Sequence, residues 1–132
     1  MTVFDTSVVV DLLLGSGTGP AAAELVRAER IVAAPDVVVL EVLAVLRRSV
    51  VRREFAEERA AFAVDDLAAA PLVLFPSLEL RQGAWALRHR MAAADALFAA
   101  LAAELDEPLA TADRDLANAA EAHGLTVVRL QA

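Results

Sequence analysis

Cysteine and lysine are both absent from this chain of 132 residues. Without cysteine, the chain can form neither a disulfide framework nor a thiolate metal site. Only two histidines are present, His89 and His123, so a zinc site is not expected. A divalent ion in this protein would need oxygen ligands, which are the ligands that Mg²⁺, Mn²⁺ and Ca²⁺ prefer.

Positive charge is also scarce, because 12 arginines stand against 19 acidic residues. The formal net charge of −7 makes the chain a poor nonspecific binder of nucleic acid, since affinity for phosphate comes largely from lysine and arginine. Any contact with nucleic acid must therefore be local. Acids gathered around a metal would add to the negative count without repelling a substrate once the ion is bound.

Long uninterrupted hydrophobic runs are missing, although 58% of the residues are hydrophobic. The runs VVVDLLL and VVVLEVLAVL are broken by acids and fall short of the about 20 residues that a membrane-spanning helix needs. The N-terminus has no basic region followed by an apolar stretch and a small-residue cleavage site. We therefore expect a cytoplasmic protein without a membrane segment and, by length, a single domain over residues 1–132.

Short apolar runs alternate with helical patterns along the chain. Strands are expected at MTVF, IVAAP, PLVLFP, EPLATAD and LTVVRL. Helices are expected in the segments between them, at residues 7–14, 20–30, 36–53, 54–70, 77–90, 92–105 and 113–123. This alternation predicts an α/β fold with a mostly parallel sheet of four to five strands.

Glu41 lies within PDVVVLEVLAVLRR, residues 35–48, which is apolar on nearly every side. A helix with no polar stripe should be buried in its first turns, and Glu41 with it. Burying a carboxylate without a partner costs several kcal/mol. We therefore expect Glu41 to meet an arginine, a proton or a metal ion.

Acidic residues also follow two of the expected strands. Asp5 comes directly after MTVF, and Asp113 follows LATA. Because ligands bind beyond the carboxyl ends of parallel strands, both carboxylates would open into one crevice if the two strands are neighbours. Glu41 and Asp95 could converge on the same crevice. Four carboxylates close together cannot all stay ionised without a cation, and Mg²⁺ held there could activate a water molecule.

Each of these acids also has a structural interpretation. Asp5 and Asp113 could cap the helices that they precede. Glu41 could belong to a buried ion pair with an arginine, and Asp95 could interact with the helix dipole in a first turn.

Other polar and aromatic residues are interpreted as structural. Asp11 lies on the first helix, and Asp36 stands where a capping residue is expected. Trp85, the only tryptophan, is interpreted as a packing residue rather than a platform for base stacking. Arginines at the far end of the Glu41 helix suit either the helix dipole or a phosphate, and the pattern leaves both roles open: Arg47, Arg48, Arg52 and Arg53.

Taken together, the ordered acids resemble the PIN-domain family, and within it the VapC-type toxins of bacterial toxin–antitoxin pairs. The matching stretches are FDTSVVVDLLL, APDVVVLEVLAVLRR, AADALFAALA and LATADRDLANAA, which span almost the whole chain in the order of the family. Phe98 stands where many relatives have tyrosine, and this removes a hydroxyl group but no acid.

This resemblance implies a three-layer α/β/α sandwich and an endoribonuclease that depends on Mg²⁺ or Mn²⁺. It implies metal ligands at Asp5, Glu41, Asp95 and Asp113, with Asp115 as an additional catalytic acid. Thr6, or Ser7 beside it, and Thr111 match polar positions that often assist that site. In the mechanism that we expect, one or more of Arg47, Arg48 and Arg52 hold flanking phosphates. The resemblance further implies an RNA substrate, a homodimer and a VapB-like antitoxin that covers the active-site groove.

Three other enzyme classes fit the sequence less well. A receiver domain needs a lysine near its last strand, and the chain has none. A phosphatase of the haloacid-dehalogenase type needs a second aspartate two residues after the first, where this chain has Ser7. No P-loop motif is present. The remaining alternative is a noncatalytic protein whose acidic groove binds an arginine-rich peptide, and divalent metal binding would distinguish it from a nuclease.

Overall fold

The five apolar runs each form a strand in the computed structural model, which describes residues 1–132. The strands are β1 (Val3–Phe4), β2 (Val32–Pro35), β3 (Leu72–Phe75), β4 (Leu109–Thr111) and β5 (Val127–Arg129). They form one sheet in the order β3-β2-β1-β4-β5, and every neighbouring pair is parallel. The predicted α/β fold with a parallel sheet is therefore confirmed.

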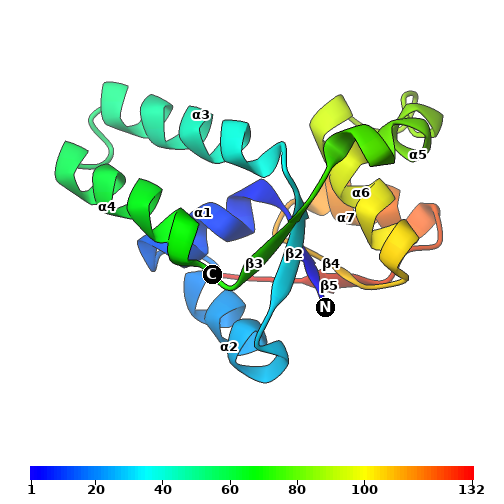
Figure 1. Ribbon diagram of the computed structural model, residues 1–132, viewed down its shortest axis with the longest axis horizontal. Coiled ribbons are helices and arrows are strands. Elements are labelled where there is room, and N and C mark those ends of the chain that lie inside the picture. The colour runs from blue at the N-terminus through cyan, green and yellow to red at the C-terminus, as the bar shows by residue number, and fades with distance from the viewer.

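Helices cover the sheet on both sides (Figure 1). The first group lies on the left of the view and comprises α1 (Thr6–Leu14), α2 (Gly19–Glu29), α3 (Val38–Val51) and α4 (Glu57–Ala69). The second group lies on the right and comprises α5 (Arg81–Ala86), α6 (Ala93–Leu105) and α7 (Arg114–Ala122), with a 3₁₀ turn at Ser77–Leu80 before α5. This arrangement is the predicted three-layer sandwich.

The core is centred on β1, β2 and β4, which have helices on both faces. Val3, Phe4, Ala33, Leu109 and Ala110 are fully buried. Strands buried on both faces are apolar at successive positions rather than alternating, and this explains why the runs could be identified from the sequence. No single helix is long and apolar enough to cross a membrane, although α1 and α2 reach that length together with a bend of 96° between them.

The predicted burial of the Glu41 helix is wrong for one of its faces. Val38, Val42 and Leu46 are buried, whereas Leu40 is 68% exposed and Leu43 is 43% exposed. The buried residues recur every four positions and pack on the core, so the rest of this apolar helix is left without a covering element.

The capping role expected of Asp36 and the packing role expected of Trp85 are also wrong. Asp36 does not cap α3, because its Oδ1 accepts a hydrogen bond of 3.1 Å from the backbone N–H of Ser77. Trp85 is not packed in the core, because its side chain is 69% exposed. The segment that carries it forms only a short helix on the outside of α6.

Candidate active site

The sheet topology creates a crevice beside β1. The chain proceeds from β1 to β2 and β3 on one side, and it then crosses to place β4 on the other side of β1. Phe4 pairs with Ala110, so the carboxyl ends of β1 and β4 lie next to each other. In open α/β sheets, ligands bind at this kind of switch point. Asp5 and Asp113 follow these two strand ends, as the sequence predicted.

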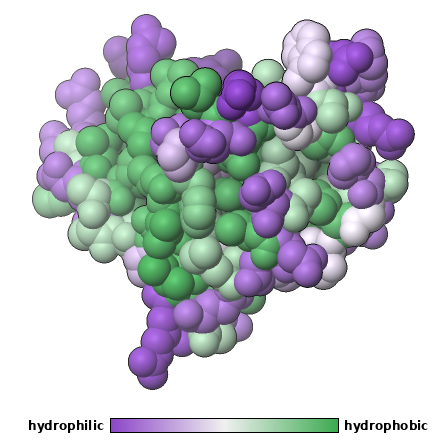
Figure 2. All heavy atoms as spheres, turned by 45° about the vertical axis from the view of Figure 1, so that its right-hand side comes forward, coloured by the Kyte–Doolittle hydropathy of each residue, from purple (hydrophilic) through white to green (hydrophobic).

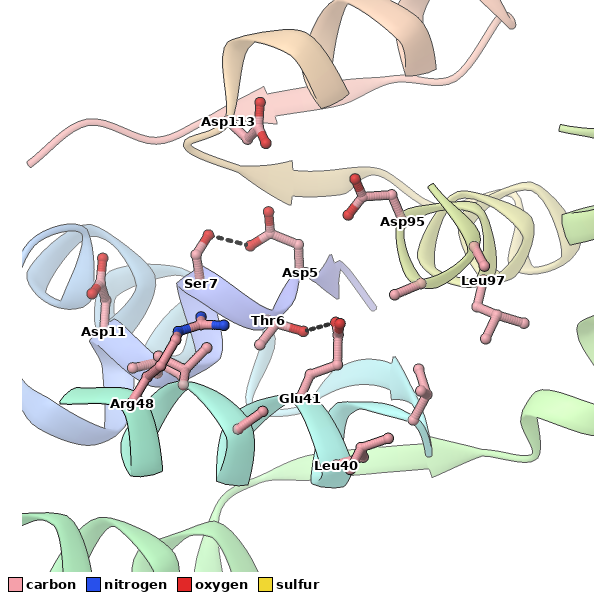
Figure 3. Close-up of a pocket in the computed structure, with 16 residues that line it drawn as sticks. Asp5, Thr6, Ser7, Asp11, Leu40, Glu41, Arg48, Asp95, Leu97 and Asp113 are labelled. Carbon is pink, nitrogen blue, oxygen red and sulfur yellow. Dashed lines mark hydrogen bonds between the residues drawn. The ribbon is translucent and has the colours of Figure 1, made fainter. Parts of the chain in front are cut away.

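A pocket of about 740 Å³ lies at this crevice (Figure 3). Its acidic lining residues come from four segments that are distant in the sequence, with Asp5 and Asp11 both at α1: Asp5, Asp11, Glu41, Asp95 and Asp113. The fold therefore brings together all four predicted metal ligands.

Asp5 is held by a network of neutral donors. Its side chain is 5% exposed, and its Oδ1 accepts hydrogen bonds of 3.0 Å from the backbone N–H of Val8 and from the hydroxyl of Ser7. Its Oδ2 accepts a hydrogen bond from the Thr111 hydroxyl. The Thr111 oxygen in turn accepts the backbone N–H of Asp113 at 3.0 Å, so one hydroxyl connects the ends of β1 and β4.

Glu41 enters the pocket from the first turn of α3. Its Oε1 accepts a hydrogen bond of 2.6 Å from the Thr6 hydroxyl, and Figure 3 shows this contact across the floor of the site. Its side chain is half-buried, and none of the ion pairs in the structure includes it. The interpretation of Glu41 as half of a buried ion pair with arginine is therefore wrong.

The carboxylates share one electrostatic environment. Burial raises the pKa of Asp95 to about 6, and the negative charges of Asp113, Asp5 and Glu41 contribute to that increase. Burial also raises the pKa of Asp5, with a further contribution from Asp113, although hydrogen bonds from Thr111, Val8 and Ser7 oppose the increase. These effects are the ones expected of partly buried acids that repel one another.

The capping interpretations of Asp5 and Asp113 are correct, and they do not exclude a place in the pocket. Asp5 is the N-cap of α1. Asp113 is the N-cap of α7, where its Oδ1 accepts the backbone N–H groups of Asp115 at 2.8 Å and Leu116 at 3.2 Å. Its other carboxylate oxygen makes no hydrogen bond within the protein and remains available to a ligand.

The structure separates the remaining predicted site residues into two groups. Thr6 and Arg48 line the pocket, and Thr111 does not line it but donates a hydrogen bond to Asp5. Asp115, Arg47 and Arg52 do not line the pocket, and all three are exposed.

Asp11 lines the pocket, but its side chain has a structural role. Its Oδ2 accepts hydrogen bonds of 2.9 Å from both the backbone N–H and the hydroxyl of Thr18. The structural interpretation of Asp11 is correct. No role for Thr18 was predicted, because a contact between two residues seven positions apart produces no periodic pattern in the sequence.

The donor set fits a hard divalent cation in its chemistry. Every polar atom that the four acids, Thr6 and Ser7 offer is an oxygen, as Mg²⁺ and Mn²⁺ require. The side chains are not arranged for coordination as they stand, because no three acidic or histidine residues lie close enough together to hold one ion. Binding an ion would therefore require these carboxylates to move closer together.

Comparison with known proteins assigns the chain to a family. Residues 2–122 match the PIN domain. The chain belongs to the PIN-domain family. Among curated PIN-domain relatives, it is 40% identical over 118 residues to ribonuclease VapC1 of Mycobacterium tuberculosis, covering 89% of each chain. It is 34% identical over 124 residues to ribonuclease VapC12 of the same organism, covering 94% of this chain and 93% of the relative.

A solved structure supports the fold of this PIN domain. The crystal structure of VapBC2 from Rickettsia felis, bound to a DNA fragment from their promoter, matches with a TM-score of 0.67 over 98% of both chains. At 12% identity this similarity is one of fold alone. The predicted resemblance to the PIN domain and to VapC-type ribonucleases is confirmed.

Proposed function

We propose that this chain is a VapC-type endoribonuclease, the toxin of a VapBC toxin–antitoxin pair, which hydrolyses RNA with Mg²⁺ or Mn²⁺. The observation that carries this proposal is the convergence of Asp5, Glu41, Asp95 and Asp113 on one pocket. The match to the PIN domain spans residues 2–122, a range that contains all four positions. We also propose that residues 1–132 form one domain, since all five strands belong to one sheet.

The four acids would hold the ion, and the bound ion would activate water and stabilise charge on a phosphate oxygen. Asp5 is kept in position by the Thr111 hydroxyl, and Glu41 by the Thr6 hydroxyl. The pKa of Asp95, raised to about 6, lets this group lose its proton at neutral pH and act as a ligand. Arg48 is the one arginine on the pocket wall and would contact a flanking phosphate.

An antitoxin and a second copy of this chain are the proposed protein partners. Several large apolar side chains are exposed on α3, β3 and the 3₁₀ turn, and they are Val39, Leu40, Leu43, Leu74 and Leu78. Figure 2 shows a broad hydrophobic area on the side of the molecule that carries α3. An exposed apolar area of this kind is typical of a protein interface.

The decisive experiment is cleavage of total RNA by the purified protein, freed of any bound partner, with Mg²⁺, with Mn²⁺ and with a chelator. We expect discrete fragments that require the ion and that disappear in Asp5→Asn. Asp65→Asn is the matched control, because it removes the same charge from an exposed position on α4. An Asp5→Asn protein that cuts as fast as the wild type would contradict the assignment.

Glu41→Gln separates metal binding from folding. This variant keeps a carbonyl oxygen that can accept from Thr6 but loses the charge. We expect weaker Mn²⁺ binding in calorimetry, with little change in the free energy of unfolding measured without metal. A loss of folding without a metal defect would favour a purely structural role.

A further inference from the structure

Trp85 stands beside a second, smaller pocket next to the active site. This pocket has a volume of about 270 Å³, and Trp85, Arg81 and Arg88 form its polar and aromatic side. Ala93 and Leu97 line both this pocket and the carboxylate pocket, and they lie on either side of Asp95 in α6. The two pockets are therefore neighbours across one turn of helix, where α5 packs on α6 (Figure 1).

The charges of the two pockets are opposite. The carboxylate pocket is lined by five acids, whereas the Trp85 pocket is lined by two arginines and no acid. Neither arginine belongs to an ion pair. Arg81 donates to the backbone carbonyl of Leu78 and Arg88 to that of Trp85, both at 3.0 Å. Each guanidinium has five N–H donors, so most of them remain free to bind an anion.

The aromatic ring is already arranged for stacking. The guanidinium carbon of Arg88 lies 5.0 Å from the centroid of the Trp85 ring, within the range of a cation–π contact. The side chain is nevertheless 69% exposed. Most of this ring is therefore open to a ligand, and aromatic and arginine side chains are the groups on which single-stranded nucleic acids stack their bases.

We propose that Trp85, Arg81 and Arg88 form a subsite for one unpaired nucleotide of the RNA, adjacent to the scissile phosphate. The base stacks on Trp85, and the phosphates meet the two arginines. The volume of the subsite lies below the about 300–1,000 Å³ of pockets for drug-sized ligands, so it suits one base rather than a helix of a partner protein. This inference rests on the proposed function, and it explains how an acidic protein holds RNA through a local cationic site.

The test measures binding separately from cleavage. Asp5→Asn protein is titrated with fluorescently labelled single-stranded oligoribonucleotides in Mg²⁺, and the dissociation constant is read from anisotropy. Adding Trp85→Ala is expected to weaken binding about tenfold, within the range for loss of one stacked base. Trp85→Phe should restore most of the affinity. Because Trp85 is the only tryptophan, its fluorescence in the parent protein should also be quenched by the oligonucleotide.

Matched controls come from the same chain. Phe62 on α4 is another aromatic residue with 69% exposure, and it lines neither pocket. Phe62→Ala should leave RNA binding within twofold of the parent. Arg88→Gln should weaken binding and reduce its salt dependence, whereas Arg90→Gln, outside the subsite, should have less effect on both.

The outcomes distinguish failure of the subsite from failure of the proposed function. If Trp85→Ala binds RNA as tightly as Phe62→Ala does, the subsite is wrong even when the wild type cuts RNA. A Trp85→Ala protein with normal RNA binding and an altered oligomeric state on gel filtration would instead assign the ring to a protein contact and overturn the inference. If the wild type cuts no RNA but binding depends on Trp85, the nuclease assignment fails and the subsite stands.

Discussion

At the scale of single residues, neutral hydroxyl groups hold the pocket carboxylates in place. Thr111 donates to Asp5 and Thr6 donates to Glu41, and no ion pair involves either acid. A hydroxyl donor fixes the geometry of a carboxylate without cancelling its charge. The negative charge of the pocket therefore stays available to a cation.

Replacing Thr111 by valine tests this arrangement. Thr111→Val keeps the shape of the side chain, but it leaves buried Asp5 Oδ2 without its donor and the Asp113 N–H without its acceptor. We expect a loss of about 1–3 kcal/mol in the free energy of unfolding, measured with urea. Thr111→Ser keeps the hydroxyl and should lose less. Equal stability of the valine variant and the wild type would show that the hydroxyl network contributes nothing.

The burial of Asp95, together with repulsion from the neighbouring acids, predicts a pH dependence of stability in metal-free protein. The pKa of this group is 3.8 when unperturbed and about 6 in the folded chain, so the folded state binds its proton more tightly. The contribution of Asp95 to the free energy of unfolding should therefore fall as pH rises from about 4 to about 6 and stay low above that.

Asp95→Asn removes this contribution and leaves the packing almost unchanged. With a chelator present, the free energy of unfolding of the variant should exceed that of the wild type by about 1–3 kcal/mol at about pH 7.5. This gain should disappear below about pH 4. Urea denaturation at a series of pH values measures the difference, with Asp65→Asn as the exposed control. A gain that is the same at all pH values would contradict the ionisation of buried Asp95 as its cause.

At the scale of elements, two helix N-termini place the site. Asp5 caps α1 and Asp113 caps α7, and both carboxylates also line the pocket. The residues that begin these helices are thus the residues that carry the proposed chemistry. The interpretation of these two residues as helix caps was therefore correct for the fold but incomplete for the function.

Substitutions of Asp113 can separate its two roles. Asp113→Asn keeps an oxygen that caps α7 and should leave stability nearly unchanged while weakening Mn²⁺ binding. Asp113→Ala removes the cap as well and should cost about 1 kcal/mol of stability. Thermal denaturation and calorimetry with Mn²⁺ measure the two effects. Equal stability of the two variants would show that the cap contributes little.

The corner between α1 and α2 depends on close backbone approach. A Cβ atom at Gly19 would lie 2.4 Å from the backbone carbonyl oxygen of Asp11, whereas one at Gly15 would meet nothing within 4 Å. Gly15 does have a positive φ of 66°, which costs a residue with a side chain about 1–2 kcal/mol.

Gly19→Ala should therefore destabilise the protein more than Gly15→Ala. We expect a loss of about 3 kcal/mol for Gly19→Ala, because the main chain itself must shift to relieve the contact. The midpoints of thermal denaturation of the two variants give the comparison. A larger loss for Gly15→Ala would show that the corner can open without cost.

At the scale of the whole molecule, part of the net charge of −7 is concentrated at the carboxylate pocket. Five of the 19 acids line one pocket, and the neighbouring pocket is cationic. A bound divalent ion would offset part of the negative charge of the carboxylate pocket, and the two arginines of the neighbouring pocket would offer positive charge to an RNA strand. Net charge alone therefore gave a misleading impression of how this protein can hold RNA.

Metal binding should be visible in the stability of the whole chain. A ligand that binds only the folded state at about 100 times its dissociation constant adds about 2.7 kcal/mol to the free energy of unfolding. We expect Mn²⁺ to raise the melting temperature of the wild type and to have little effect on the double variant Asp5→Asn, Glu41→Gln. An equal increase in both proteins would place the ion elsewhere.

The sequence by itself determined the elements and the ends of the strands. The five strands are short, largely apolar runs, and helical patterns fill the segments between them, so all five strands and the seven helices could be located from local patterns. Asp5 and Asp113 could be placed in one crevice because carboxyl ends of neighbouring parallel strands meet at one edge of the sheet. The family resemblance rested on the same ordered residues.

Only the tertiary structure decided which faces are covered and which distant side chains meet. Leu40 and Trp85 are apolar in the sequence yet exposed, because burial depends on the neighbouring elements rather than on the residue itself. The contact of Thr6 with Glu41 joins positions 35 residues apart, and that of Thr111 with Asp5 joins positions 106 apart. Such contacts depend on the order of strands in the sheet, and the local periodicity of the sequence does not indicate that order.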